Sequence, residues 1–169
     1  MKHKIILLAL CCVPFMAFAQ SKFGYVNPQE VYAAMPEKAT IEKNLQDLAA
    51  SYDKELSSMR DEYNKKLKDF SDKEDSLPQS VVQVRQNEII TIEQRITSLN
   101  QTAQSDLQKK QTELVQPILD KIRKAINEVG AENGLIYIFD STSGIFVYNS
   151  NQVVDVLPMV KKKLNIRWL

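Results

Sequence analysis

Apolar residues recur at every third or fourth position along most of the chain, on a background of polar and charged residues. Between residues 36 and 76 the steps between apolar positions are four or three, and the pattern repeats every eleven residues. Eleven residues complete about three helical turns, so such a repeat keeps one narrow apolar stripe on one face of a helix. The stripe of this first predicted helix consists of Ile41, Leu45, Leu48, Tyr52, Leu56, Met59, Tyr63, Leu67 and Phe70.

A second stretch, residues 79–129, carries the same eleven-residue repeat. Pro117 is predicted to bend this helix, because proline removes one backbone hydrogen bond. Since each stripe is narrow, each helix is expected to pack against little more than one neighbour. One row of the second stripe is Ile92, Ala103, Leu114 and Ala125, another is Ile96, Leu107, Ile118 and Val129, and a third fades from Leu99 to Lys110 and Lys121.

The chain has no glycine between Gly24 and Gly130, and the sequence SLPQS (residues 76–80) lies in the middle of this stretch. Ser76 is expected to cap the incoming helix, and Pro78 to stop one helix and open the next. The sequence therefore predicts an antiparallel helical hairpin, an arm over residues 36–129 with its tip at residues 76–80. A helix of about 41 residues would be roughly 60 Å long.

The pattern changes on both sides of the arm. Residues 23–26 are predicted to form a short strand, followed by a short helix over residues 29–35 with Asn27 as its cap and Pro28 at its first position. After the arm, Gly130 and Gly134 are expected to end the second helix, with Asn133 also suited to the turn.

The C-terminal part of the chain reads as a strand hairpin followed by a helix. Residues 135–139 form a continuous apolar run, residues 140–144 a turn, and residues 145–148 a second apolar run. Continuous rather than alternating apolarity predicts strands that are buried on both faces. A short helix over residues 155–164, with Pro158 in its first turn, closes the chain.

The segments outside the arm, residues 20–35 and 130–169, make a body too small to be comfortably stable alone. Exposed strands would also be an aggregation hazard, so the sequence favours a body stabilised by oligomerisation. The predicted fold class is α+β, mainly α: a long antiparallel two-helix coiled-coil arm on a small β-rich oligomerisation body. The expected oligomerisation strands carry Phe23, Tyr25, Val26, Ile136, Ile138, Ile145 and Val147.

Residues 1–19 are typical of a secretory signal peptide. Lys2 and Lys4 precede an apolar run that is too short to span a membrane, and residues 17–19, Ala-Phe-Ala, fit the small-x-small rule for cleavage after Ala19. The alternative is a lipoprotein signal at Cys11 or Cys12, which requires a small residue just before the cysteine; Leu10 and Cys11 stand there instead. The sequence therefore predicts export to the periplasm.

Export would remove both cysteines and the single histidine, His3, together with two of the 22 basic residues. Twenty basic residues would then face 21 acidic ones, a net charge of about −1, which is not the balance of a nucleic-acid-binding protein. Without cysteine or histidine the mature chain offers no catalytic triad, no thiol nucleophile and no Cys/His zinc site. Glycine-rich phosphate loops are excluded in the glycine-free arm. We expect no enzymatic activity, no catalytic residues, no cofactor and no metal.

Three other groups of residues have simpler structural interpretations than a functional one. Acidic pairs such as Asp61 and Glu62 have lysine or arginine beside them, which is typical of a solvated coiled-coil face. Met59, Tyr63 and Phe70 could touch a partner, but their spacing favours the seam between the helices. The lysines at residues 161–163, with Arg167, make a weak candidate for a lipid patch, and lysines also complement the dipole at a helix C-terminus.

The chain is predicted to be exported, and its elements follow the order strand, helical arm, strand hairpin and terminal helix. In this order it resembles the Skp/OmpH-like family of periplasmic chaperones for outer-membrane proteins. The resemblance covers essentially all of the mature chain. It is most specific in KFGYVNPQEVYAAMPE (residues 22–37) and PILDKIRKAINEVGAENGLIYIFD (residues 117–140), whereas in the arm it rests on layout.

The resemblance implies a jellyfish-like homotrimer, in which strands from three chains form the body and three arms surround a cavity. It also implies an ATP-independent holdase that keeps unfolded outer-membrane β-barrel proteins from aggregating in that cavity. Family members are typically strongly basic, whereas this mature chain is near neutral. Contact with membrane or lipopolysaccharide is therefore expected to be weak, and apolar and backbone contacts to dominate.

The residues allow a second interpretation, a structural coiled-coil adaptor or spacer of the cell envelope. An adaptor would have the same architecture but would bind one folded partner and ignore unfolded chains. The sequence does not identify the residues that contact a client, nor the clients themselves.

Overall fold

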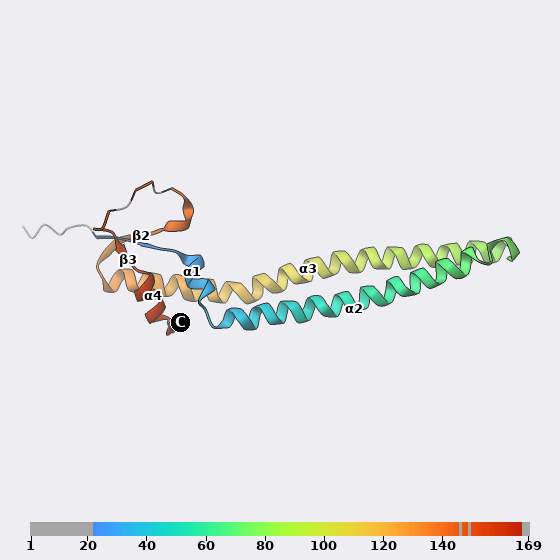
Figure 1. Cartoon of the computed structure of the whole chain (residues 1–169), viewed down its shortest axis with the longest axis horizontal. Helices are drawn as coiled ribbons and strands as arrows, with labels where there is room; N and C mark the ends of the chain where they lie inside the picture. The colour runs from blue at the N-terminus through green and yellow to red at the C-terminus, as the bar shows by residue number, and fades with distance from the viewer. Residues whose placement is uncertain (1–21, 146, 149, 167–169) are drawn as a thin grey trace, which may run out of the picture.

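The computed structural model describes residues 22–145, 147, 148 and 150–166. Two long helices run side by side away from a small body that holds the remaining elements (Figure 1). The predicted fold class, mainly α with a long helix pair and a small sheet, is confirmed. In chain order the elements are β1 (Lys22–Val26), α1 (Pro28–Ala33), α2 (Glu37–Ser71), the 3-10 turn η2 (Glu74–Ser76), α3 (Gln79–Glu132), β2 (Leu135–Asp140), the 3-10 turn η3 (Ser141–Ser143), β3 (Val154–Asp155) and α4 (Leu157–Lys163).

The arm consists of α2, with 35 residues, packed antiparallel to most of α3, with 54. At 1.5 Å per residue these helices are about 50 and 80 Å long. The predicted stripes form most of the seam between them, but Leu67, which the α2 stripe includes, is 42% exposed. Ile41, Leu56 and Met59 are buried on α2, and α3 continues through Pro117 without a break in its helical assignment. The buried residues of α3 that belong to the two predicted rows are Ile92, Ala103, Ile118, Ala125 and Val129.

At the tip, the expected serine cap is wrong. The Ser76 hydroxyl donates a hydrogen bond to the Lys73 carbonyl, 2.8 Å away, within η2. Pro78 is the residue that precedes α3, and its carbonyl accepts hydrogen bonds from the amides of Val81 and Val82 in the first turn of the helix. Ser76 lies too far upstream to reach these amides because Leu77 is extended, so α3 begins without a side-chain cap.

The three strands form one parallel sheet in the order β2-β1-β3. Phe23 pairs with Tyr137 and Tyr25 with Phe139 on one side of β1, while Tyr25 pairs with Asp155 on the other. The whole arm is the connection between β1 and β2. The sheet brings together segments more than a hundred residues apart.

The predicted strand hairpin is therefore wrong. β2 pairs with β1 rather than with the segment that follows it, and β3, at residues 154 and 155, was not predicted. Ile145 and Val147 lie in no strand, and residue 146 is outside the described residues. The predicted burial of both sheet faces is also not found within one chain, since Ile136 and Tyr137 of β2 are exposed.

Gly130 does not end α3, as the sequence suggested, but lies inside it. It is buried against β2, where an added Cβ would stand 3.1 Å from Cδ1 of Ile138. The helix ends at Glu132, and Asn133 caps it by donating its side-chain amide to the Val129 carbonyl. Gly134 follows with φ +62°, a left-handed conformation that glycine adopts without strain.

The hydrophobic core lies where the inner face of the sheet, α1, α4 and the body end of α3 meet. Val31, Val129, Val156 and Val160 are almost completely buried there, and the core continues into the arm as far as Ile41. The predicted cap of the first helix is confirmed, because the Asn27 side chain accepts a hydrogen bond from the Glu30 amide at 3.0 Å. The predicted signal peptide, residues 1–19, lies outside the described residues.

Candidate functional surfaces of the body and the arm

The outer face of the sheet is aromatic. Because side chains alternate along a strand, Gly24 and Val26 face the core, whereas Phe23 and Tyr25 lie on the other face. Phe23 stacks on Tyr137 and on Phe139 of β2, with ring centroids 6.4 and 6.0 Å apart. Phe23 is 37% exposed and Tyr137 62% exposed, so this face is covered by little else within the chain.

The segment that follows β2 adds to this apolar surface. The Asp140 carboxylate accepts hydrogen bonds from the amide and the hydroxyl of Thr142, which hold the turn η3. Ile145, Val147 and Tyr148 then lie in the open, and Val147 is fully exposed. Between this segment and the sheet is a groove with a volume of about 430 Å³, and its lining residues are Phe23, Tyr25, Phe139, Ser141, Val147, Tyr148 and Val153.

The seven residues expected on the oligomerisation strands fall into two groups. Val26 is buried, and Ile138 is half-buried against the core and Gly130, so both support the chain's own sheet. The other five lie on the aromatic face, on the edge strand β2 or in the segment after it. These are Phe23, Tyr25, Ile136, Ile145 and Val147.

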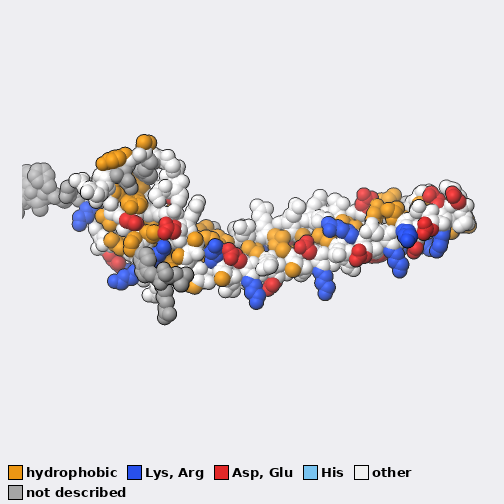
Figure 2. Space-filling model, in the orientation of Figure 1, with side chains coloured by type: hydrophobic (Ala, Val, Ile, Leu, Met, Phe, Trp, Pro, Cys, Tyr) orange, Lys and Arg blue, Asp and Glu red, His pale blue; other side chains and the backbone are white. Residues whose placement is uncertain are grey.

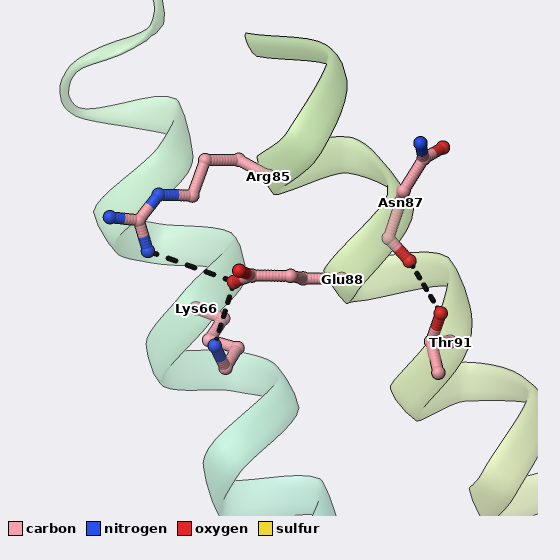
Figure 3. A network of polar contacts seen from close by, with 5 residues as sticks. All are labelled: Lys66, Arg85, Asn87, Glu88 and Thr91. Carbon is pink, nitrogen blue, oxygen red and sulfur yellow. Dashed lines mark hydrogen bonds and ion pairs between the residues drawn. The ribbon is translucent and has the colours of Figure 1, made fainter. Parts of the chain in front are cut away.

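Three polar contacts cross the seam of the arm and fix the register of α2 against α3. They are the Tyr52 hydroxyl with the Asp106 carboxylate at 2.5 Å, Lys66 Nζ with the Glu88 carboxylate at 2.8 Å, and Lys121 Nζ with the Glu37 carboxylate at 2.7 Å. In Figure 3, the Lys66 side chain reaches from α2 to Glu88 on α3, and Arg85 approaches the same carboxylate from its own helix at 3.7 Å.

These contacts shift the pKa values of Glu88, Glu37 and Tyr52. The hydrogen bond from Lys66 lowers the pKa of the Glu88 carboxyl, and the hydrogen bond from Lys121 lowers the pKa of Glu37. The hydrogen bond to Asp106 raises the pKa of the Tyr52 hydroxyl, because the ionised phenol would face a carboxylate. All three shifts favour the protonation states that hold the two helices together near neutral pH.

The outer half of the arm exposes apolar side chains that do not belong to the seam. Met59 is buried and Tyr63 and Phe70 are half-buried, which confirms that they form the seam. Val84 and Ile90, in contrast, are about half exposed. The sequence analysis did not single out these two residues. The available signal was that both are apolar but lie outside the eleven-residue stripe. Figure 2 shows apolar side chains on the body and, along the arm, in a band interrupted by charged side chains.

Val84 lines a shallow groove on the surface of the arm. It has a volume of about 420 Å³ and lies between α2 and α3. Its apolar lining residues, Val84 and Ile92, come from α3, and the ion-paired Lys66 and Glu88 also line it. The residues around it are Glu62, Lys66, Val84, Asn87, Glu88, Thr91 and Ile92.

The basic end of the chain is largely neutralised by acidic neighbours. Lys161 pairs with Glu30 of α1 at 3.4 Å. Lys163 pairs with Glu128 and Glu132 of α3, which raise the pKa of its ammonium. These pairs dock α4 onto the rest of the body, while Arg167 lies outside the described residues. A strongly positive lipid-binding surface is therefore not formed by the described part of this end.

Within the described residues, no polar or charged residue is buried, and no group of three acidic, histidine or cysteine side chains is placed to hold a metal ion. None of the helices in the described part of the chain is both long enough and apolar enough to cross a membrane. The acidic residues singled out in the sequence lie on solvated helix faces, and the features that stand out are exposed apolar surfaces on the body and the arm.

Comparison with known proteins places the chain in a family. Residues 22–164, which include every helix and strand described above, match the family of outer membrane proteins described as OmpH-like. The chain is also similar to the chaperone protein Skp of Pectobacterium atrosepticum, with 22% identity over 144 residues that cover 85% of this chain and 87% of the relative. The chain therefore belongs to the OmpH-like family of outer membrane proteins.

Proposed function

We propose that this protein is an ATP-independent periplasmic holdase, a chaperone that binds unfolded outer-membrane β-barrel proteins and prevents their aggregation on the way to the outer membrane. Family membership and the chaperone name of the relative support the assignment. The observation that carries it is the arm: two helices that extend from the body without a core of their own beyond one seam, with apolar side chains left in the open. Such a surface can shield an unfolded chain without any chemical step.

The body is the proposed site of assembly into a homotrimer. Its sheet has an aromatic outer face with Phe23 and Tyr137 partly open to solvent, and β2 is an edge strand. The apolar residues Ile145 and Val147 are exposed beside this face. Apolar surface of this kind on a small body is stabilised by burial against further chains. In the trimer, three arms would then enclose the cavity in which the client is held.

The proposed contacts to the client are of two kinds, apolar contacts and contacts with the client's backbone. Electrostatic attraction is not expected to dominate. An unfolded β-barrel protein exposes apolar side chains and unpaired strand edges, which aggregate unless they are covered. Val84 and Ile90 of α3 and Leu67 of α2 are the exposed apolar side chains in the outer half of the arm that could cover them. The near-neutral mature chain leaves only weak contact with membrane or lipopolysaccharide.

An aggregation assay tests this proposal. An outer-membrane β-barrel protein, unfolded in urea, is diluted into buffer with and without the chain lacking residues 1–19, and the aggregate is measured by turbidity and sedimentation. A holdase keeps the barrel protein soluble without nucleotide. Precipitation of the barrel protein to the same extent in both samples would contradict the proposal and would favour the envelope adaptor, which ignores unfolded chains. The folded barrel protein is the control, because a holdase should not bind it.

A further inference from the structure

The buried residues of the arm form two separate groups with a gap between them. Near the body, Ile41 of α2 and Ile118 of α3 belong to the body's core. No residue of segments 42–55 and 104–117, here called the mid-arm segment, is buried. Beyond it, in what we call the outer arm (residues 56–71 and 79–103), the buried residues are Leu56, Met59, Val82, Ile89, Ile92 and Ala103.

The seam is thin in the mid-arm segment because of the residues that the sequence places there. Leu48 and Leu107 are only half-buried, and Lys110 stands where the eleven-residue row from Leu99 would put an apolar residue. Leu45 and Leu114, at the inner end of the segment, still contact the edge of the body's core. The apolar packing is therefore weakest between this inner end and the outer arm.

The backbone of α3 is also weakened in the mid-arm segment. Pro117 has no amide hydrogen, so the Glu113 carbonyl loses its helical donor. The missing bond makes local opening of the helix there less costly.

Across this gap, the hydrogen bond between Tyr52 and Asp106 joins the two helices. The hydroxyl and the carboxylate oxygen are 2.5 Å apart, and both side chains are half-buried. A hydrogen bond to a charged acceptor is stronger than one between neutral groups. This bond compensates for the apolar contacts that the mid-arm segment lacks.

We propose that the arm opens first in the mid-arm segment, while the outer arm stays closed as one packed unit, and that the Tyr52–Asp106 hydrogen bond holds the segment shut. Ordinary fraying would instead open the arm from its tip. Local stability follows buried contacts, and these are fewer in the mid-arm segment than on either side of it. The inference concerns the arm itself and does not depend on the identity of the client.

Amide hydrogen exchange, followed by mass spectrometry on the assembled protein, tests the proposal. The variant is Tyr52→Phe, which removes only the hydroxyl. Tyr63→Phe is the matched control, because Tyr63 occupies the same position of the next eleven-residue repeat. Tyr63 is also half-buried, and its hydroxyl makes no hydrogen bond within the part of the chain that the structure describes.

We expect peptides from the mid-arm segment to exchange about tenfold faster than those of the outer arm in the unmodified protein. Tyr52→Phe should accelerate exchange in the mid-arm segment by a further factor of about five and leave residues 89–103 unchanged, whereas Tyr63→Phe should not accelerate it. Exchange that rises steadily from body to tip would overturn the proposal. So would equal effects of the two substitutions on the mid-arm segment. Circular dichroism of both variants checks that they keep their helices.

Discussion

At the scale of single residues, the body depends on a position in its sheet that leaves little room for a side chain. Gly24 lies in the central strand, between β2 and β3. A Cβ at this position would stand 2.9 Å from the Leu135 side chain, 3.1 Å from that of Val156 and 3.3 Å from the Val154 carbonyl oxygen. Because backbone lies on one side of it, the space cannot be widened by moving a side chain alone.

We therefore expect Gly24→Ala to lower the free energy of unfolding of the body by about 1–3 kcal/mol, the usual cost of overpacking. Urea unfolding followed by circular dichroism measures the change. Gly144→Asn is the control: Gly144 has φ +66° and open space around it, and asparagine tolerates this conformation. A Gly24→Ala protein as stable as the control would show that the sheet is looser than described.

The pKa shift of Glu88 predicts how the arm responds to acid. The bond from Lys66 lowers the pKa of this carboxyl from its ordinary value of 4.5. Its contribution to stability is therefore fully present above about pH 4.5 and is lost as the pH falls through the lower, folded-state pKa. The Lys66 side chain is 33% exposed and the Glu88 side chain 41% exposed, so solvent screens the pair and its contribution to stability is small.

Glu88→Gln should accordingly melt at a slightly lower temperature than the unmodified protein at pH 7, and the difference should shrink between pH 5 and pH 3. Thermal unfolding at a series of pH values measures this. Glu93→Gln is the control, because Glu93 lies on the same helix and has no ion pair among the described residues. Its melting temperature should depend on pH as that of the unmodified protein does. A constant difference at every pH would refute the role of the ion pair.

At the scale of elements, the arm could be predicted from the sequence because its signal is local. The eleven-residue stripe that includes Ile41, Leu56 and Met59 places the same residues in the seam of the structure. Pro78 marks the start of the second helix within one residue of its observed position. Helices depend mainly on neighbours three and four positions apart, which a sequence shows directly.

The sheet could not be predicted in the same way, because its pairing depends on contacts distant in the sequence. Two apolar runs separated by a turn favour a hairpin, yet β2 pairs with β1 across the length of the arm. β3 has two residues and no recognisable pattern. The run of residues 145–148 has the composition of a strand, but Ile145, Val147 and Tyr148 are exposed in the single chain. The composition of a strand does not indicate which other strand it pairs with. The exposed Val84 was missed because hydrophobic periodicity identifies buried positions and not exposed ones.

The length of the arm should matter for the client and not for assembly. Deleting residues 56–66 from α2 and 90–100 from α3 removes one eleven-residue repeat from each helix and keeps the facing positions in register. We expect the oligomer to be retained and the holding of large clients to weaken more than that of small ones. Aggregation assays with barrel proteins of different size measure this. Equal protection of all clients by the shortened arm would count against a cavity between arms.

At the scale of the whole molecule, the apolar surfaces divide the protein into a part that assembles and a part that holds. The aromatic face and the exposed Ile145 and Val147 belong to the body, about 80 Å of helix away from the tip. Val84 and Ile90 belong to the outer arm. Substitutions in the two regions are therefore expected to have separable effects.

The double substitution Ile145→Asp and Val147→Asp should break the oligomer while the helices of each chain stay folded. Both side chains are exposed in the single chain, so the charges disturb little there, but they would be costly in an apolar contact between chains. Ile138 would be a poorer choice, since it packs against Gly130 and the core. Light scattering reports the mass, and Val84→Asp on the arm is the control that should leave it unchanged. A double variant that still assembles would move the contact away from this segment.

The most direct test is the mass, by light scattering at physiological salt, of the chain without residues 1–19. The mass is measured alone and again after a urea-unfolded outer-membrane barrel protein has been diluted into the sample. We predict the mass of three chains alone, and a soluble complex of three chains with one client afterwards. A single-chain mass, or a stable oligomer beside a precipitated barrel protein, would contradict the proposal that the body assembles the chains and the arms hold the client.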